Sequence, residues 1–247
     1  LYNDATEIDA VVGGNIDMVS TYMSKLTSVD TDTQYCLAPY LFNDVYEMES
    51  FYTSEYAQPL YEKINALGLK VVDVMFGGEQ YFMSNGDSIR NIDGFQGKKV
   101  REGGGAMTRA LYDALGASVT TVSFNELYTA MQTKLVDIAV TSIDSAVNIQ
   151  LQEVLESVSA YKIQYAPYLI MFNQAVWDSY PEALQNVIEE GLEMAREKQL
   201  EYTDETCAAA IELVKSSCDF YEASDEEIAE LKALWQPIVE EDVSRKW

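Results

Sequence analysis

The sequence predicts an α/β protein with largely parallel sheets, and three observations support that class. Segments typical of strands alternate with segments typical of helices along most of the chain, as in βαβ units. Hydrophobic residues make up 48% of the 247 residues and charged residues 23%, which is enough to build an ordinary core. A helical segment from Pro181 to about Lys215 would reach roughly 50 Å, longer than one small domain is wide, so we expect it to lie across two lobes.

Glycines, prolines and capping residues mark the ends of the expected elements. Gly68 is a stop signal for a helix, Gly77 follows a strand, and Pro181 suits the first turn of the long helix. The expected helices cover residues 4–13, 45–67, 106–115, 124–134, 146–156, 181–215 and 225–242. The expected strands cover residues 16–19, 70–76, 99–101, 118–122, 136–140, 164–172 and 218–221. Ser123 and Glu126 have the spacing of a capping box for the helix over 124–134.

Composition excludes several classes of function. The formal charge of −25 and the pI near 4.1 argue against nucleic acid and against an anionic membrane surface as partners. Such a charge favours a soluble monomer. The chain has no histidine, and its three cysteines have no zinc-binding spacing, so we expect neither a metal nor another cofactor. The cysteines are expected to be small buried hydrophobic residues.

Arg101 is the strongest candidate for a binding residue. It lies at the end of the strand over 99–101, just before three glycines and the start of a helix. Ligands of α/β folds lie at the carboxyl ends of strands, and a guanidinium offers a planar fork that fits a carboxylate. From this segment alone, the simpler interpretation is a surface arginine paired with a carboxylate such as Glu102 or Asp137.

Further motifs in a fixed order strengthen the binding interpretation. The segment Gly97–Asp137 resembles the solute-binding subunits of TRAP transporters, the DctP-type family, and the resemblance covers nearly the whole chain. The matching segments are Gly14–Met18, Leu37–Phe42, Gly97–Arg101, Ala110–Ala117, Val122–Met131, Lys134–Asp137 and Leu169–Ser179. Lys134 and Ile138 replace two glycines of the family pattern.

The resemblance implies a two-lobed periplasmic-binding-protein-like (type II) fold, with hinge crossovers and a long helix spanning both lobes. Lobe I would comprise residues 1–78 and 167–206, and lobe II residues 79–166 and 207–247. Hinges are expected near residues 77–82 and 165–170. Family members begin with a strand and a helix before the segment matching Leu1, so we expect such a segment to precede this chain and to complete the sheet of lobe I.

The resemblance also assigns the ligand site. Arg101 matches the signature arginine that pairs with the ligand carboxylate. For Asn173 and Phe124 two alternatives stay open: ligand contact, or a strand-end cap and a core residue respectively. The full set of expected ligand-binding residues is Arg101, Asn173, Phe124, Tyr81, Thr141, Asp4, Thr21 and Tyr22.

Two departures from the family pattern bear on the ligand. Tyr81 stands where some members carry a second arginine, and Thr141 stands where the family has an asparagine. A second ligand carboxylate would then lack an obvious partner, so we expect a monocarboxylate with an aromatic or apolar body. Tyr22 and Phe82 would add to the aromatic lining.

The resemblance implies an extracytoplasmic binding protein rather than an enzyme. It would capture a small organic acid at the periplasmic or extracellular face, with a lipid anchor as one form of attachment, and deliver it to TRAP transporter membrane subunits. The same fold as the ligand-sensing ectodomain of a signalling receptor is the alternative. An enzyme using paired carboxylates is a weaker one, because the chain offers no histidine and no activated nucleophile.

Overall fold

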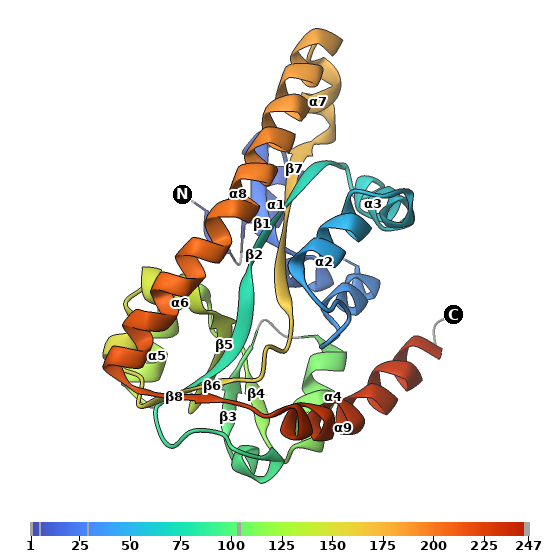
Figure 1. The fold of residues 1–247 in the computed structure, drawn as a ribbon. Coiled ribbons are helices and arrows are strands. Elements are labelled where there is room, and N and C mark those ends of the chain that lie inside the picture. The colour runs from blue at the N-terminus through green and yellow to red at the C-terminus, as the bar shows by residue number, and fades with distance from the viewer. Residues whose placement is uncertain (1, 5, 29, 103–104, 245–247) are drawn as a thin grey trace.

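The computed structural model describes residues 2–4, 6–28, 30–102 and 105–244, and its centre is a mixed sheet (Figure 1). The described strands run in the order β1-β7-β2-β5-β3-β4, with β6 pairing with β2 and β8 with β6. Their bounds are β1 Met18–Tyr22, β2 Leu69–Ser84, β3 Lys99–Arg101, β4 Ser118–Thr120, β5 Ile138–Ser142, β6 Ser157–Ala160, β7 Tyr165–Asn173 and β8 Asp219–Glu222. The strand β6 was not expected from the sequence.

The sheet has two regions that share the long strand β2. In the first sheet region, β7 lies between β1 and residues 69–79 of β2, and both pairings are antiparallel. In the second sheet region, residues 80–84 of β2 pair antiparallel with β5 and β6. The pairs β3–β4, β3–β5 and β6–β8 are parallel. The expectation of largely parallel sheets is therefore wrong, because β2 and β7 run in opposite directions through the middle of the molecule.

Two glycines at the middle of β2 explain why the strand continues where the sequence predicted an end. A Cβ on Gly78 would lie 2.5 Å from Cys207 Sγ, and one on Gly77 would lie 3.1 Å from the Tyr168 ring. These glycines therefore allow neighbouring chain segments to approach closely, rather than ending the strand. The register of β2 against β7 also shifts between Gly77 and Glu79.

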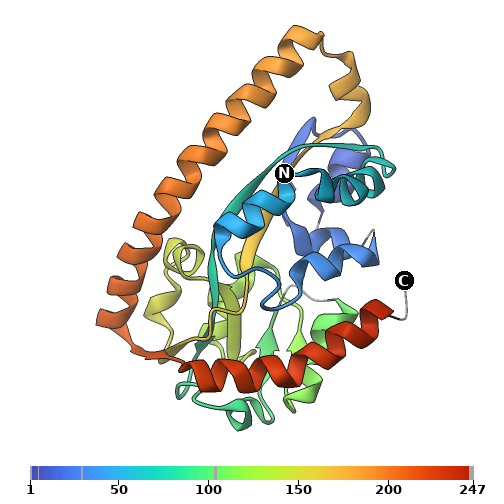
Figure 2. The same ribbon diagram turned by 45° about the vertical axis from the view of Figure 1, so that its right-hand side comes forward.

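Helices cover both sheet regions, and the longest runs along the whole molecule (Figure 2). The α-helices are α1 Glu7–Val12, α2 Val45–Tyr52, α3 Gln58–Asn65, α4 Ala106–Ala114, α5 Leu127–Gln132, α6 Ile143–Asn148, α7 Gln174–Ser179, α8 Glu182–Ser217 and α9 Asp225–Ser244. Short 3-10 helices are η1 Met23–Ser28, η2 Thr31–Leu37, η3 Glu55–Ala57, η4 Ile92–Phe95, η5 Phe124–Glu126 and η6 Leu151–Glu153.

Three expected helices are each divided into shorter helical segments. The segment 45–67 divides into α2, η3 and α3, with Ser54 capping η3. The segment 146–156 divides into α6 and η6, where Gln150 has a left-handed backbone. The segment 124–134 divides into η5 and α5, and Ser123 makes no side-chain cap bond. Its hydroxyl instead donates to the Glu126 carboxylate at 2.7 Å, so the predicted capping box is wrong.

The buried hydrophobic residues form three clusters that follow the two sheet regions. One cluster lies on the first sheet region and includes Leu26, Phe76 and Leu200. The other two lie on the second region, one around Phe82 and Trp235 and one around Met83, Val136 and Val214. The helix α8 thus contributes Leu200 to one end of the molecule and Val214 to the other.

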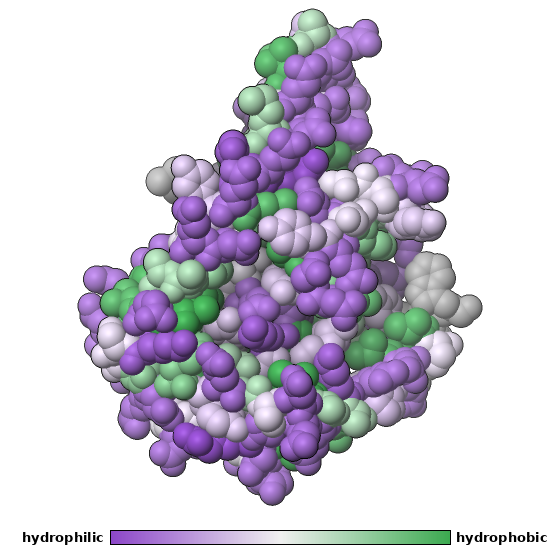
Figure 3. Space-filling model, in the orientation of Figure 1, coloured by the Kyte–Doolittle hydropathy of each residue, from purple (hydrophilic) through white to green (hydrophobic). Residues whose placement is uncertain are grey.

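The face drawn in Figure 3 is mostly hydrophilic, including the projecting end formed by α7 and the start of α8. Among the described residues, no helix combines the length and the apolar character that a membrane span needs.

Candidate functional site

A cavity of about 270 Å³ lies where the two sheet regions meet. One wall comes from α1, β1 and η1, and the other from β3, β5 and the segment that leads into α5. Gln80 of β2 and Tyr168 of β7 lie on the strands that connect the walls. The lining residues are Asp4, Glu7, Ser20, Thr21, Tyr22, Ser24, Lys25, Gln80, Arg101, Glu102, Phe124, Val140, Thr141, Ser145 and Tyr168.

Arg101 is the buried cation of this cavity. Its residue is 6% exposed, and its Nε donates a hydrogen bond of 3.0 Å to the carbonyl oxygen of Val122. Within the described part of the chain, its terminal nitrogens form neither a hydrogen bond nor an ion pair. Burial lowers the pKa of Arg101, and the nearby carboxylates of Glu102 and Asp4 oppose that shift. A guanidinium remains charged at neutral pH, so the cavity presents a fixed donor fork for an anion.

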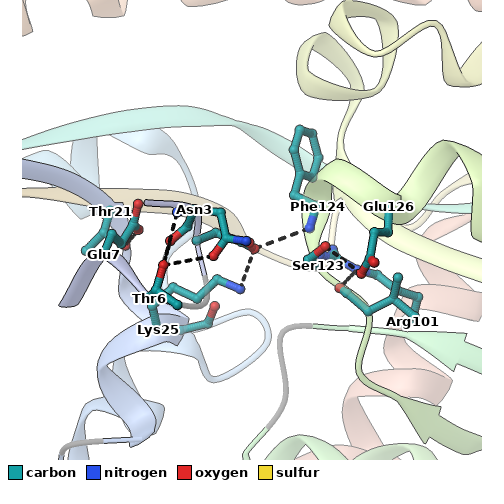
Figure 4. Close-up of polar contacts among 12 residues, drawn as sticks. Asn3, Thr6, Glu7, Thr21, Lys25, Arg101, Ser123, Phe124 and Glu126 are labelled. Atoms are coloured by element: carbon teal, nitrogen blue, oxygen red, sulfur yellow. Dashed lines mark hydrogen bonds and ion pairs between the residues drawn. The ribbon is translucent and has the colours of Figure 1, made fainter. Parts of the chain in front are cut away.

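The ring of Phe124 lies beside that fork. The Arg101 Cζ is 6.0 Å from the ring centroid, within the range of a cation–π contact. Asp137, one of the alternative partners of Arg101, instead accepts a hydrogen bond of 2.8 Å from the Lys99 backbone N–H. Arg101 and Phe124 lie together on one side of the close-up in Figure 4.

Asp4 joins the two walls of the cavity. Its Oδ2 lies 2.8 Å from Lys25 Nζ and accepts a hydrogen bond of 3.2 Å from the Phe124 backbone N–H. Burial acts to raise the pKa of Asp4, but the bonds from Lys25 and Phe124 and the charge of Arg101 outweigh it, so the pKa is lowered. Asp4 Oδ1 is buried without a partner among the described residues.

Tyr22 is fixed at the junction of the walls by two amides. Its hydroxyl oxygen accepts hydrogen bonds of 3.1 Å from both Gln80 and Gln164, and Gln164 also donates to Gln80 at 2.8 Å. Burial raises the pKa of Tyr22. The Tyr22 ring lies 5.6 Å from the Tyr168 ring. These contacts join β1 to the two chain segments that cross between the sheet regions.

The opposite side of Figure 4 holds a carboxylate and hydroxyl pair. The Thr21 hydroxyl donates to Glu7 Oε1. Burial, aided by the nearby charge of Asp4, raises the pKa of Glu7. The neighbouring Ser24 is 3% exposed, and its hydroxyl has no partner among the described residues.

Six of the eight expected site residues line this cavity. They are Arg101, Phe124, Thr141, Asp4, Thr21 and Tyr22. Two do not, and both have structural roles. The Asn173 side chain caps α7 by accepting from the Val176 N–H at 3.2 Å, and its amide donates to the Val11 carbonyl at 2.9 Å. The Tyr81 side chain packs against Phe220 in a hydrophobic cluster and donates to Glu79 at 2.9 Å. Phe82 is likewise fully buried in the core.

Several lining residues were missed, and Lys25 matters most. The expectation of a monocarboxylate assumed that the site has no second cation, and Lys25 lies in the cavity. One signal was available: Lys25 is one of only 16 basic residues, close in sequence to Thr21 and Tyr22. Its pairing with Asp4 is long-range and has no sequence signature. Glu7 was missed because one more carboxylate in a chain with 41 acidic residues carries little information.

The three cysteines lie outside the set of residues that line the cavity. Cys36, Cys207 and Cys218 are free and half-buried rather than buried, and each packs against a hydrophobic cluster, as expected of a small hydrophobic residue. Burial raises the pKa of Cys36 to about 11 and that of Cys207 to about 12. Over the ranges that the structure describes, no group of three cysteine or carboxylate residues is arranged to hold a metal ion.

Comparisons with known proteins assign the chain to a family. The family model described as DctP, bacterial extracellular solute-binding protein, family 7, matches residues 1–246. The chain belongs to this family, as the resemblance predicted. A C4-dicarboxylate-binding periplasmic protein DctP of Rhodobacter capsulatus is 25% identical over 99% of this chain and 74% of its own length. A C4-dicarboxylate-binding protein DctB of Bacillus subtilis is 20% identical over 96% of this chain and 69% of its own.

Solved structures confirm the fold. A TRAP periplasmic solute-binding protein from Shewanella oneidensis with bound succinate has a TM-score of 0.92 and 21% identity, over 98% of this chain and 79% of that one. One from a Sulfitobacter species with bound β-D-galacturonate also has a TM-score of 0.92, with 17% identity, over 99% of this chain and 81% of that one. The predicted two-lobed α/β fold with a long helix is therefore confirmed.

Proposed function

We propose that this protein is the extracytoplasmic solute-binding protein of a TRAP transporter, which captures a small organic acid and delivers it to membrane subunits. The observation that carries the proposal is the buried Arg101 guanidinium, which lines the cavity with its terminal nitrogens uncommitted among the described residues. A carboxylate is the group that such a fork fits with two parallel hydrogen bonds. A buried cation facing a cavity is stabilised when an anion enters.

The family supports the location and the partners. Its members are bacterial extracellular solute-binding proteins, and relatives of this chain bind C4-dicarboxylates. Neighbouring structures hold succinate or galacturonate. We therefore place the protein at the periplasmic or extracellular face, as a monomer that binds and releases its ligand without chemical change. Membrane attachment through a lipid remains part of this proposal.

Binding measurements on an arginine variant test the proposal. We expect a panel of organic acids, measured by thermal shift and then by calorimetry, to contain acids that stabilise the wild-type protein. Arg101→Ala should lose that binding, because truncating one partner of a buried charge pair costs about 2–5 kcal/mol. Arg101→Lys keeps the charge without the fork and should bind weakly.

The control is Arg109→Ala, which removes an exposed arginine from α4 and should bind as the wild type does. All variants should retain a cooperative melting transition. An acid that binds Arg101→Ala with wild-type affinity would overturn the assignment of Arg101.

A further inference from the structure

The charged residues of the cavity indicate which second group its ligand carries besides a carboxylate. Three carboxylates and two cations line the cavity: Asp4, Glu7, Glu102, Lys25 and Arg101. Asp4 is paired with Lys25. Glu7 accepts one hydrogen bond, from the Thr21 hydroxyl, and has no ion-pair partner among the described residues. A partly buried carboxylate without a counter-charge is unfavourable.

We propose that the ligand is an acid that also carries a protonated amine, with its carboxylate on Arg101 and its ammonium on Glu7. This inference rests on the proposed function and deepens it. Glu7 and Arg101 lie on opposite sides of the site, with Lys25 between them (Figure 4). Both line the same cavity, so one small ligand can contact both. A carboxylate only accepts hydrogen bonds, and an ammonium only donates them, so the two are complementary.

Other ligand groups fit the Glu7 side less well. A second carboxylate would lie beside Glu7 and Asp4, and the one nearby cation, Lys25, is already paired with Asp4 at 2.8 Å. A hydroxyl could donate to Glu7 but would leave its charge unbalanced. Ser24 is the second observation that indicates a ligand here: it is 3% exposed and lines the cavity, and its hydroxyl has no partner within the described ranges.

Two series of probes, each differing in a single group, test this inference. The first series is 4-aminobutyrate, 4-hydroxybutyrate, valerate and glutarate, in which ammonium, hydroxyl, methyl and carboxylate occupy the same end of the chain. The second is norvaline, 2-hydroxyvalerate, 2-methylvalerate and propylmalonate, which places the group next to the carboxylate instead. In at least one series we expect the ammonium acid to bind about 10- to 100-fold more tightly than its hydroxyl counterpart.

The variant Glu7→Gln keeps the size of the side chain and removes its charge. It should abolish the preference for ammonium over hydroxyl, so that the two acids bind with similar affinity. The exposed Glu205→Gln on α8 is the matched control and should keep the preference. The ranking in the wild-type protein is an independent readout if Glu7→Gln folds poorly.

The pH dependence gives a second readout. Burial raises the pKa of Glu7, with Asp4 adding to the shift and Lys25 and Thr21 opposing it. Lowering the pH through that raised pKa protonates Glu7 and removes the charge that holds the ammonium. The affinity for the ammonium acid should therefore fall on acidification more steeply than that for the hydroxyl acid, and Glu7→Gln should remove the difference.

The outcomes separate this inference from the proposed function. If a hydroxyl, methyl or carboxylate acid binds as tightly as the ammonium acid in both series, the role of Glu7 is wrong and that of Arg101 stands. If Glu7→Gln keeps the ammonium preference, the inference is also wrong. If no acid of either series binds, the proposed function fails for acids of this size and this inference fails with it.

Discussion

At the scale of single residues, the structure separates residues that line the cavity from residues that only match the family pattern in sequence. Arg101 and Phe124 line one cavity, as predicted, because Arg101 ends β3 and Phe124 begins η5 on the same side of the cavity. Asn173 was open to two interpretations, and its hydrogen bonds to Val176 and Val11 favour the cap. A motif match gives the position of a residue in a fold, but the direction of a side chain depends on partners far away in the sequence.

The variant Asn173→Ala tests this distinction. It removes the cap of α7 and the bond to the Val11 carbonyl, so we expect the free energy of unfolding to fall by about 1–2 kcal/mol. The affinity for any acid that binds should stay at its wild-type value. Chemical denaturation and calorimetry check the two expectations, and a loss of affinity without a loss of stability would restore Asn173 to the binding site.

Some contacts of the cavity could not be predicted from the sequence. The family pattern identifies Arg101, but Lys25 meets Asp4 across 21 residues of chain, and Asp4 meets Phe124 across 120. Such contacts require the fold. The family pattern therefore predicts Arg101, Phe124, Asp4 and Thr21 as lining residues, but the sequence does not predict Glu7 or Lys25.

At the scale of elements, the order of helices and strands was predicted better than their pairing. The long helix was expected over 181–215 and α8 covers Glu182–Ser217, because the segment is rich in residues that favour helix, such as Glu, Ala, Leu and Lys. The strand expected over 70–76 continues to Ser84, because Gly77 and Gly78 serve close packing rather than a turn. Strand direction in the sheet is not encoded locally, so the antiparallel pairs of β2 were missed.

The helix α8 is attached to the first sheet region by a largely buried ion pair. Arg196 bonds to Asp73 on β2, and its Nε lies 3.3 Å from the Glu49 carboxylate. The Arg196 and Asp73 side chains are only 12% and 8% exposed. Burial raises the pKa of Asp73, and Arg196 opposes that shift.

We expect Arg196→Met to destabilise the fold by about 3 kcal/mol or more, because it leaves Asp73 buried without its counter-charge. Lys198→Met removes an exposed ion pair on the same helix and should change stability by less than about 1 kcal/mol. Urea denaturation of both variants gives the comparison. Equal effects would show that α8 is held by its hydrophobic contacts alone.

At the scale of the whole molecule, the predicted division into lobes remains a prediction that the core supports. The hydrophobic clusters separate near Gly77 of β2 and between Leu200 and Val214 of α8, close to the predicted boundaries. One segment departs from that division: Ala38 packs in the second region's core, and the Tyr40 N–H donates to the Ile163 carbonyl at 2.8 Å.

Further polar contacts hold the two regions together. Gln34 donates to the Asp242 carboxylate of α9 at 3.1 Å, and its Oε1 accepts from the Met107 N–H at 3.1 Å. Apart from the packing around Ala38, these contacts are polar, so we expect the lobes to open in the absence of ligand and to close on it. Solution scattering should show a smaller radius of gyration once a binding acid is added, and no change for Arg101→Ala. An unchanged radius in the wild type would argue against hinge closure.

A crystal structure with a binding acid tests the central claim most directly. We expect the ligand carboxylate to accept two parallel hydrogen bonds from the terminal nitrogens of Arg101, with the Phe124 ring beside it. A ligand whose carboxylate lies elsewhere in the cavity, or an Arg101 side chain paired with Glu102 while ligand is bound, would contradict the account.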